Sequence, residues 1–152
     1  MDRKQLATVA VICGAVAFVA VLLPWYSVSA AGLVNYSANG TEVEFNGVFV
    51  ILLSLLAGAA ALLVVLGKTD LLPLDERQHL FAALALFALA AIVTLIDAFR
   101  DLPSISSEMG PMKSEAGKSI GLYLTLIATA AGAAASLLAT QKPASSSPAD
   151  DE

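Results

Sequence analysis

Four long stretches without a single charged side chain constrain this sequence more than any other feature. At about 1.5 Å rise per residue, each is long enough as an α-helix to cross most of a hydrocarbon core about 30 Å thick. The stretches are apolar throughout and do not alternate as strands would, and backbone groups in lipid must bond within their own segment, so helices are expected. The predicted spans are 6–23, 48–66, 80–96 and 120–139.

The composition excludes an ordinary soluble domain. Of the 152 residues, 58% are hydrophobic and 14% are charged, whereas soluble domains are about 45–50% apolar and about a quarter charged. We therefore predict an all-α membrane protein, a four-transmembrane-helix bundle with a small extracytoplasmic β-hairpin or sheet in its first loop. The bundle covers 1–140, the outer loops are 24–47 and 101–119, and 141–152 is expected to be a disordered acidic cytoplasmic tail.

The distribution of lysine and arginine predicts the orientation. The segment 24–47 has no basic residue at all, which is typical of a loop outside the cytoplasm. The expected cytoplasmic side carries Arg3, Lys4, Lys68, Arg77 and Lys142, and the outer side carries Arg100, Lys113 and Lys118. The protein is therefore predicted to lie in the cell membrane with both termini in the cytoplasm. These scattered charges do not resemble a nucleic-acid footprint, so no nucleic-acid partner is expected.

A cleaved signal peptide is the alternative interpretation of the first stretch. The chain has a basic start, and Val28-Ser29-Ala30 resembles a cleavage site. However, the apolar run exceeds the usual 7–15 or so residues, and Pro24-Trp25-Tyr26 intervenes before that site. A spanning helix is favoured, while cleavage would leave three spans.

The first outer loop shows the pattern of a small sheet. Tyr26, Val28 and Ala30 alternate with two serines, and Asn39-Gly40 lies between 34–38 and 41–45. Asn-Gly between such runs is a strong hairpin signal, because both residues tolerate the positive φ of a type I′ turn. The alternative is an irregular loop. Packing within the sheet is expected from Tyr36, Val43 and Phe45, and the candidate anchor or interaction residues are Trp25, Tyr26, Tyr36 and Phe45.

The second outer loop and the short inner loop give weaker signals. Residues 101–119 have no clear period, and a short surface helix is expected around 109–116. In the inner loop, Asp75 is expected to cap the third helix.

Small residues at four-residue spacing predict where helices approach closely, because association in lipid relies on such contact. The candidate helix-packing residues are Gly14, Gly58, Gly121 and Gly132. Packing inside one bundle is favoured. The alternative is that Ala128, Gly132 and Ser136 on the fourth helix face another subunit.

Ionisable groups are almost absent from the spans. Asp97, near the outer end of the third, is followed three residues later by Arg100, and we predict a structural ion pair between them. His79 is the single histidine and is read as a helix-boundary residue. Without a second histidine or a carboxylate cluster near it, no catalytic residue, cofactor or metal is expected.

Short motifs give a family resemblance. In Leu23-Pro24-Trp25-Tyr26-Ser27, and again in Gly121-Leu122-Tyr123-Leu124, the chain resembles a broad group of small bacterial four-helix membrane proteins of uncharacterised function. In that group, a Pro-Trp pair ends the first helix and a strand-forming outer loop follows. The topology is also similar to the claudin and tetraspan class, but the paired loop cysteines of that class are missing here, because Cys13 is the only cysteine.

These patterns favour a multi-pass membrane protein without enzymatic activity. Its expected partner, besides the lipid bilayer, is another protein or a second copy of the chain. The first hypothesis is a structural or accessory subunit that presents the outer loop. The alternative is an oligomeric conduit for a small solute, an ion or a lipid, with Asp97 as its candidate polar group.

Overall fold

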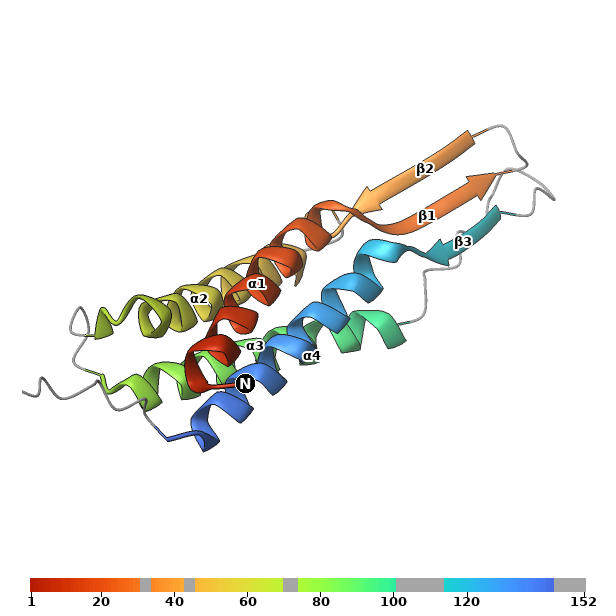
Figure 1. Ribbon diagram of the computed structural model, residues 1–152. Helices are drawn as coiled ribbons and strands as arrows, with labels where there is room; N and C mark the ends of the chain where they lie inside the picture. Colours follow the sequence, from red (N-terminus) through yellow and green to blue (C-terminus); the bar gives the residue numbers. More distant parts are fainter. Residues whose placement is uncertain (31–33, 43–45, 70–73, 101–113, 144–152) are drawn as a thin grey trace, which may run out of the picture.

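The computed structural model describes residues 1–30, 34–42, 46–69, 74–100 and 114–143. Four helices form an antiparallel bundle in which α1 packs against α2 and α4, and α3 packs against the same two neighbours (Figure 1). The helices are α1 (Arg3–Leu22), α2 (Asn46–Leu66), α3 (Glu76–Phe99) and α4 (Ile120–Gln141).

All four helices are long and apolar enough to cross a membrane. Each contains its predicted span, apart from Leu23, which is the C-cap residue of α1. The prediction of four long apolar helices is therefore confirmed. The helices are longer than the uncharged stretches because polar residues extend their ends by a turn or less.

Side-chain caps explain where two helices begin. Asp2 is the N-cap of α1, where its Oδ1 accepts the backbone N–H of Gln5 at 2.7 Å while the Gln5 side chain accepts the N–H of Asp2 at 3.0 Å. Asp75 is the N-cap of α3, as predicted, and the Gln78 side chain accepts its N–H at 2.9 Å. Such reciprocal bonds satisfy N–H groups that a first helical turn leaves without partners.

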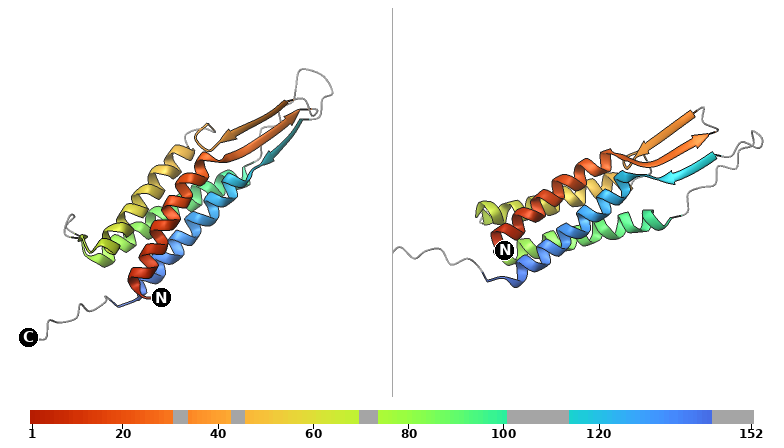
Figure 2. Two further views of the ribbon diagram at one scale, coloured as in Figure 1. Left: turned by 45° about the horizontal axis from the view of Figure 1, so that its top comes forward. Right: turned by 45° about the vertical axis from the view of Figure 1, so that its right-hand side comes forward.

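A three-stranded antiparallel sheet extends from one end of the bundle, in line with the helices (Figure 2). Its strands are β1 (Pro24–Ala30), β2 (Val34–Asn39) and β3 (Ser114–Lys118), in the order β2-β1-β3. The predicted small sheet is therefore present, but β3 comes from the second outer loop. The surface helix expected around 109–116 is wrong for 114–116, which belong to β3, and 109–113 lie outside the described residues.

The Asn39-Gly40 hairpin is also a wrong prediction. Residues 40–42 form a turn that follows β2, and among the described glycines only Gly67 has a positive φ, which is 64°. The Asn39 side chain shapes this turn by accepting the backbone N–H groups of Thr41 at 2.9 Å and Glu42 at 3.2 Å. Asparagine therefore acts as a local turn acceptor here. Val43 and Phe45 lie outside the described residues.

Candidate functional site

Trp25, at the start of β1, fixes the sheet to the bundle. Its side chain is fully buried and packs with Val21, Leu53 and Leu122 in one cluster of the core. The indole Nε1–H donates to the carbonyl of Ala20 at 3.4 Å. Trp25 is one of the predicted anchor or interaction residues. It is an anchor residue within the core, because no part of its side chain is accessible.

Glycines let the turn after β2 settle onto this tryptophan. A Cβ on Gly40 would lie 2.6 Å from Trp25 Cε2, and a Cβ on Gly47 would lie 1.9 Å from the carbonyl oxygen of Gly40. The backbone N–H of Gly40 donates to the backbone carbonyl of Val21 at 2.9 Å. The turn thus joins the end of β2 to both α1 and the start of α2.

The same region is closed on its other side by α4. Ser119, the N-cap residue of α4, donates its backbone N–H to the carbonyl of Trp25 at 2.7 Å. A Cβ on Gly121 would lie 2.7 Å from the carbonyl oxygen of Pro24 and 2.8 Å from that of Leu23. The backbone at the start of α4 is therefore in direct contact with the backbone that connects α1 to β1.

Polar side chains join the ends of α2 and α3 nearest the sheet to the sheet, and we call this group the outer junction because this end is the predicted outer one. Asn46 Nδ2 donates to Asp97 Oδ1 at 2.9 Å, and the Tyr26 hydroxyl donates to the backbone carbonyl of Asp97 at 3.3 Å. The Lys118 ammonium donates to the carbonyl of Ala98. This cation sits at the carboxyl end of α3, where the helix dipole favours positive charge.

Asp97 is buried within the outer junction, with 4% of its surface exposed, whereas Arg100 is exposed and is the C-cap residue of α3. The predicted pairing of Asp97 with Arg100 stays a prediction. Sequence reasoning did not find Asn46 as a partner of Asp97, because 51 residues separate the two and no local spacing relates them.

The other predicted loop aromatics lie in different environments. Tyr26 is half-buried in the outer junction. Tyr36, in the middle of β2, was expected to pack within the sheet, but it is 62% exposed. Phe45 lies outside the described residues. Among the described aromatics of this loop, Tyr36 is therefore the one that is mostly exposed.

The four candidate packing glycines all lie against neighbouring helices of the same chain. A Cβ on Gly14 would lie 3.2 Å from the Cα of Gly58, and one on Gly132 would lie 2.9 Å from three atoms of the Phe87 ring. Gly121 meets the end of α1 as described above. The alternative subunit interface on α4 consists of Ala128, Gly132 and Ser136. All three residues are buried within the chain.

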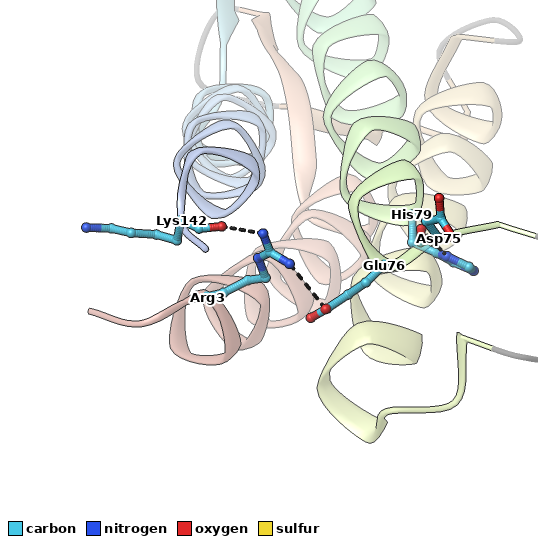
Figure 3. A network of polar contacts seen from close by, with 5 residues as sticks. All are labelled: Arg3, Asp75, Glu76, His79 and Lys142. Carbon is cyan, nitrogen blue, oxygen red and sulfur yellow. Dashed lines mark hydrogen bonds and ion pairs between the residues drawn. The ribbon is translucent and has the colours of Figure 1, made fainter. Parts of the chain in front are cut away.

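A second polar group, the inner junction, joins three helices at the opposite end of the bundle (Figure 3). The Arg3 guanidinium of α1 contacts Glu76 Oε2 of α3 at 3.2 Å and donates to the carbonyl of Lys142 at the end of α4. His79 is buried nearby, and its Nδ1 lies 3.1 Å from the carbonyl oxygen of Asp75. Arg3, predicted only as a marker of orientation, is therefore also a structural residue.

Replacing Arg3 by glutamine is expected to lower the free energy of unfolding by about 1–3 kcal/mol, because the change removes charged hydrogen bonds from a site where the side chain is only 8% exposed. Lys4→Gln is the matched control, since Lys4 is exposed and its loss is expected to change little. Denaturant unfolding in detergent micelles measures both. Equal stability of the Arg3 and Lys4 variants would contradict a structural role for Arg3.

The described polar side chains at the two ends of the bundle make hydrogen bonds and an ion pair within the chain. Across the described ranges, no group of three histidine, cysteine, aspartate or glutamate residues is placed to hold a metal ion. Comparison with protein-family models, curated proteins and solved structures finds no match for this chain. The resemblance noted around Pro24-Trp25 therefore stays a prediction.

Proposed function

We propose that this chain is a multi-pass membrane protein, with both termini in the cytoplasm, that serves as a non-enzymatic accessory subunit. In this proposal the four helices anchor the chain, and the sheet is presented to a protein partner outside the cytoplasm. The observation that carries the proposal is the combination of a sheet fixed to the bundle through Trp25 with an exposed tyrosine on that sheet, Tyr36.

Two further observations support a binding role over a chemical one. The described polar groups at the two ends of the bundle make contacts within the chain, such as Asn46 with Asp97 and Arg3 with Glu76. The sheet extends beyond the helices and carries little charge along β2 (Figure 1). A fixed, extended surface suits recognition, because little ordering entropy is lost when a partner binds.

The orientation follows from the excess of basic residues at the end of the bundle opposite the sheet. In intact cells, a membrane-impermeant maleimide is expected to label a cysteine placed at Ser37 and not one placed at Lys68, in a background where Cys13 is replaced by serine. Both positions are exposed in the structure. Labelling of the Lys68 position instead would reverse the proposed orientation, and labelling of neither until lysis would contradict exposure of the sheet outside the cell.

The interaction itself is tested by affinity purification from native membranes in a mild detergent. A second polypeptide is expected to co-purify with the wild-type chain and to be lost when Tyr36 is replaced by alanine. Tyr123→Ala is the matched control, because Tyr123 is 49% exposed but belongs to α4 and not to a strand of the sheet. Recovery of the wild-type chain alone would contradict the proposed function.

A further inference from the structure

We propose that the outer edge of β2 is the binding surface, and that it accepts an extended segment of a different polypeptide as a fourth strand. This inference rests on the proposed function and specifies how the partner is held. Strand addition at a sheet edge uses main-chain hydrogen bonds for affinity and alternate side chains for specificity.

The hydrogen-bond pattern shows which residues of β1 bond towards β2. The backbone N–H of Ser119 reaches the carbonyl of Trp25, so the backbone groups of Trp25 point to the β3 side of the sheet. Successive residues of an antiparallel strand direct these groups to opposite neighbours. The pairing of β1 with β3 keeps one register from Tyr26 to Ala30, so Val28 directs its groups to β2, where Tyr36 lies opposite it. The irregularity in the pairing of β1 with β2 lies between Pro24 and Tyr26, before this point.

The same alternation defines the open edge of β2. Because Tyr36 directs its backbone groups to β1, the adjacent residues Asn35 and Ser37 direct their N–H and C=O groups away from the sheet. No other described element runs along this side of β2 (Figure 2). At Asn39 the outward N–H is already taken by Glu42 Oε2, at 3.1 Å. The open edge of β2 thus offers the backbone N–H and C=O groups of Asn35 and Ser37. These groups suffice to pair with a short extended segment.

The two edges of the sheet differ in how they are protected. Natural edge strands are commonly blunted by charged side chains or proline, which discourage further pairing. The strand β3 contains Glu115 and Lys118, whereas β2 reads Val-Asn-Tyr-Ser-Ala-Asn and contains neither a charge nor a proline. The unprotected edge is therefore that of β2, and it is the edge we assign to the partner.

The direction of the strands argues against a second copy of this chain as the occupant. The strands continue along the axis of the bundle (Figures 1 and 2), which lies along the membrane normal in the proposed topology. Two copies in one membrane are related by rotation about that normal, so their β2 strands would run in the same direction. Antiparallel pairing between them is excluded, and the parallel alternative is less stable per residue.

Charge indicates the chemistry of the partner segment. Glu42 is exposed directly after β2, and the loop 24–47 has acidic but no basic residues. A segment that pairs with Asn35 and Ser37 and carries a lysine or arginine at its membrane-proximal end would place that cation beside Glu42. The fitting partner is thus an extended, otherwise uncharged strand with a basic residue at that end.

Photo-crosslinking in native membranes tests the edge. The full chain carries p-benzoylphenylalanine at Ser37, and we expect an adduct with a second polypeptide. Asn35→Pro, which removes an outward N–H and leaves the bonds to β1 in place, is expected to abolish the adduct, while Asn35→Thr retains it. Fluorescence of Trp25, the single tryptophan, checks that the sheet stays in place. Glu42→Gln, which keeps the acceptor for Asn39, is expected to lower the yield and remove its dependence on salt.

Several outcomes would overturn the inference. An adduct that persists in Asn35→Pro shows binding that does not use the edge, and an adduct with the mass of two copies identifies the chain itself as the occupant. If the yield of the adduct does not depend on salt and Glu42→Gln leaves it unchanged, the partner segment does not place a basic residue beside Glu42. A second variant carries the same probe at Tyr36 in place of Ser37. If that probe forms an adduct that Asn35→Pro leaves intact, the proposed function stands and the edge fails. If neither probe forms one, both fail.

Discussion

Replacing Trp25 by alanine is expected to lower the free energy of unfolding by about 3–5 kcal/mol, the range for removing a large buried aromatic side chain. The indole contacts Val21 and supports Gly40, so its loss leaves a cavity where the sheet meets the bundle. We expect faster amide hydrogen exchange in β2 and a lower melting temperature by circular dichroism. The helices should keep their secondary structure, because their own packing does not include the indole along most of their length.

The matched control for this substitution is Tyr36→Ala on the neighbouring strand. Tyr36 is 62% exposed, so its truncation is expected to change the unfolding free energy by no more than about 0.5 kcal/mol. The pair separates stability from binding, since Tyr36 is the side chain proposed to matter for the partner. A small effect at Trp25, similar to that at Tyr36, would show that the indole does not hold the sheet.

Replacing Gly47 by alanine is the second change for which a large loss is expected. The added Cβ would lie 1.9 Å from the carbonyl oxygen and 2.2 Å from the carbonyl carbon of Gly40, so one of the two backbones must move. Overpacking of this kind costs about 1–3 kcal/mol. The sign of the change in unfolding free energy is informative, because alanine in a helix is otherwise favoured over glycine by about 1 kcal/mol.

Gly58→Ala provides the control within the same helix. A Cβ there would lie 3.7 Å from the Cα of Gly14, which is ordinary contact, so α2 should gain helix propensity without a clash. We expect this variant to be as stable as the wild type or more so, measured by denaturant unfolding in micelles. A stabilised Gly47→Ala variant would contradict the close approach of Gly47 to Gly40.

The helices could be predicted from the sequence because each one is specified locally. Absence of charge, continuous apolar character and stop signals such as Pro24 are properties of single stretches, and the resulting spans lie within the observed helices apart from Leu23. Asp75 could be predicted as a cap for the same reason. The boundaries of α1 and α3 differ because Arg3 and Glu76 are polar residues that the bundle accommodates in an ion pair.

The parts that could not be predicted depend on contacts between distant segments. The strand β3 has no alternating pattern of its own, and it forms because β1 offers it a partner, with Ser27 opposite Gly117. Asn39-Gly40 has the local signal of a hairpin, but packing of Gly40 on Trp25 selects a different turn. Likewise, no periodicity relates Asn46 to Asp97, although the two meet in the outer junction.

The position of β1 between β2 and β3 has a consequence for how the chain is made. During synthesis, β1 and α1 emerge first, yet β3 and α4, which complete their surroundings, emerge last. Until Ser119 and Gly121 arrive, the backbone of Trp25 and Pro24 lacks the neighbours that it has in the finished protein. In the nascent chain the sheet edge opposite β2 is formed by the uncharged β1, whereas in the mature chain it is formed by β3, which contains Glu115 and Lys118. Uncharged open edges favour aggregation. Completion of the sheet is consequently tied to the arrival of β3 and α4.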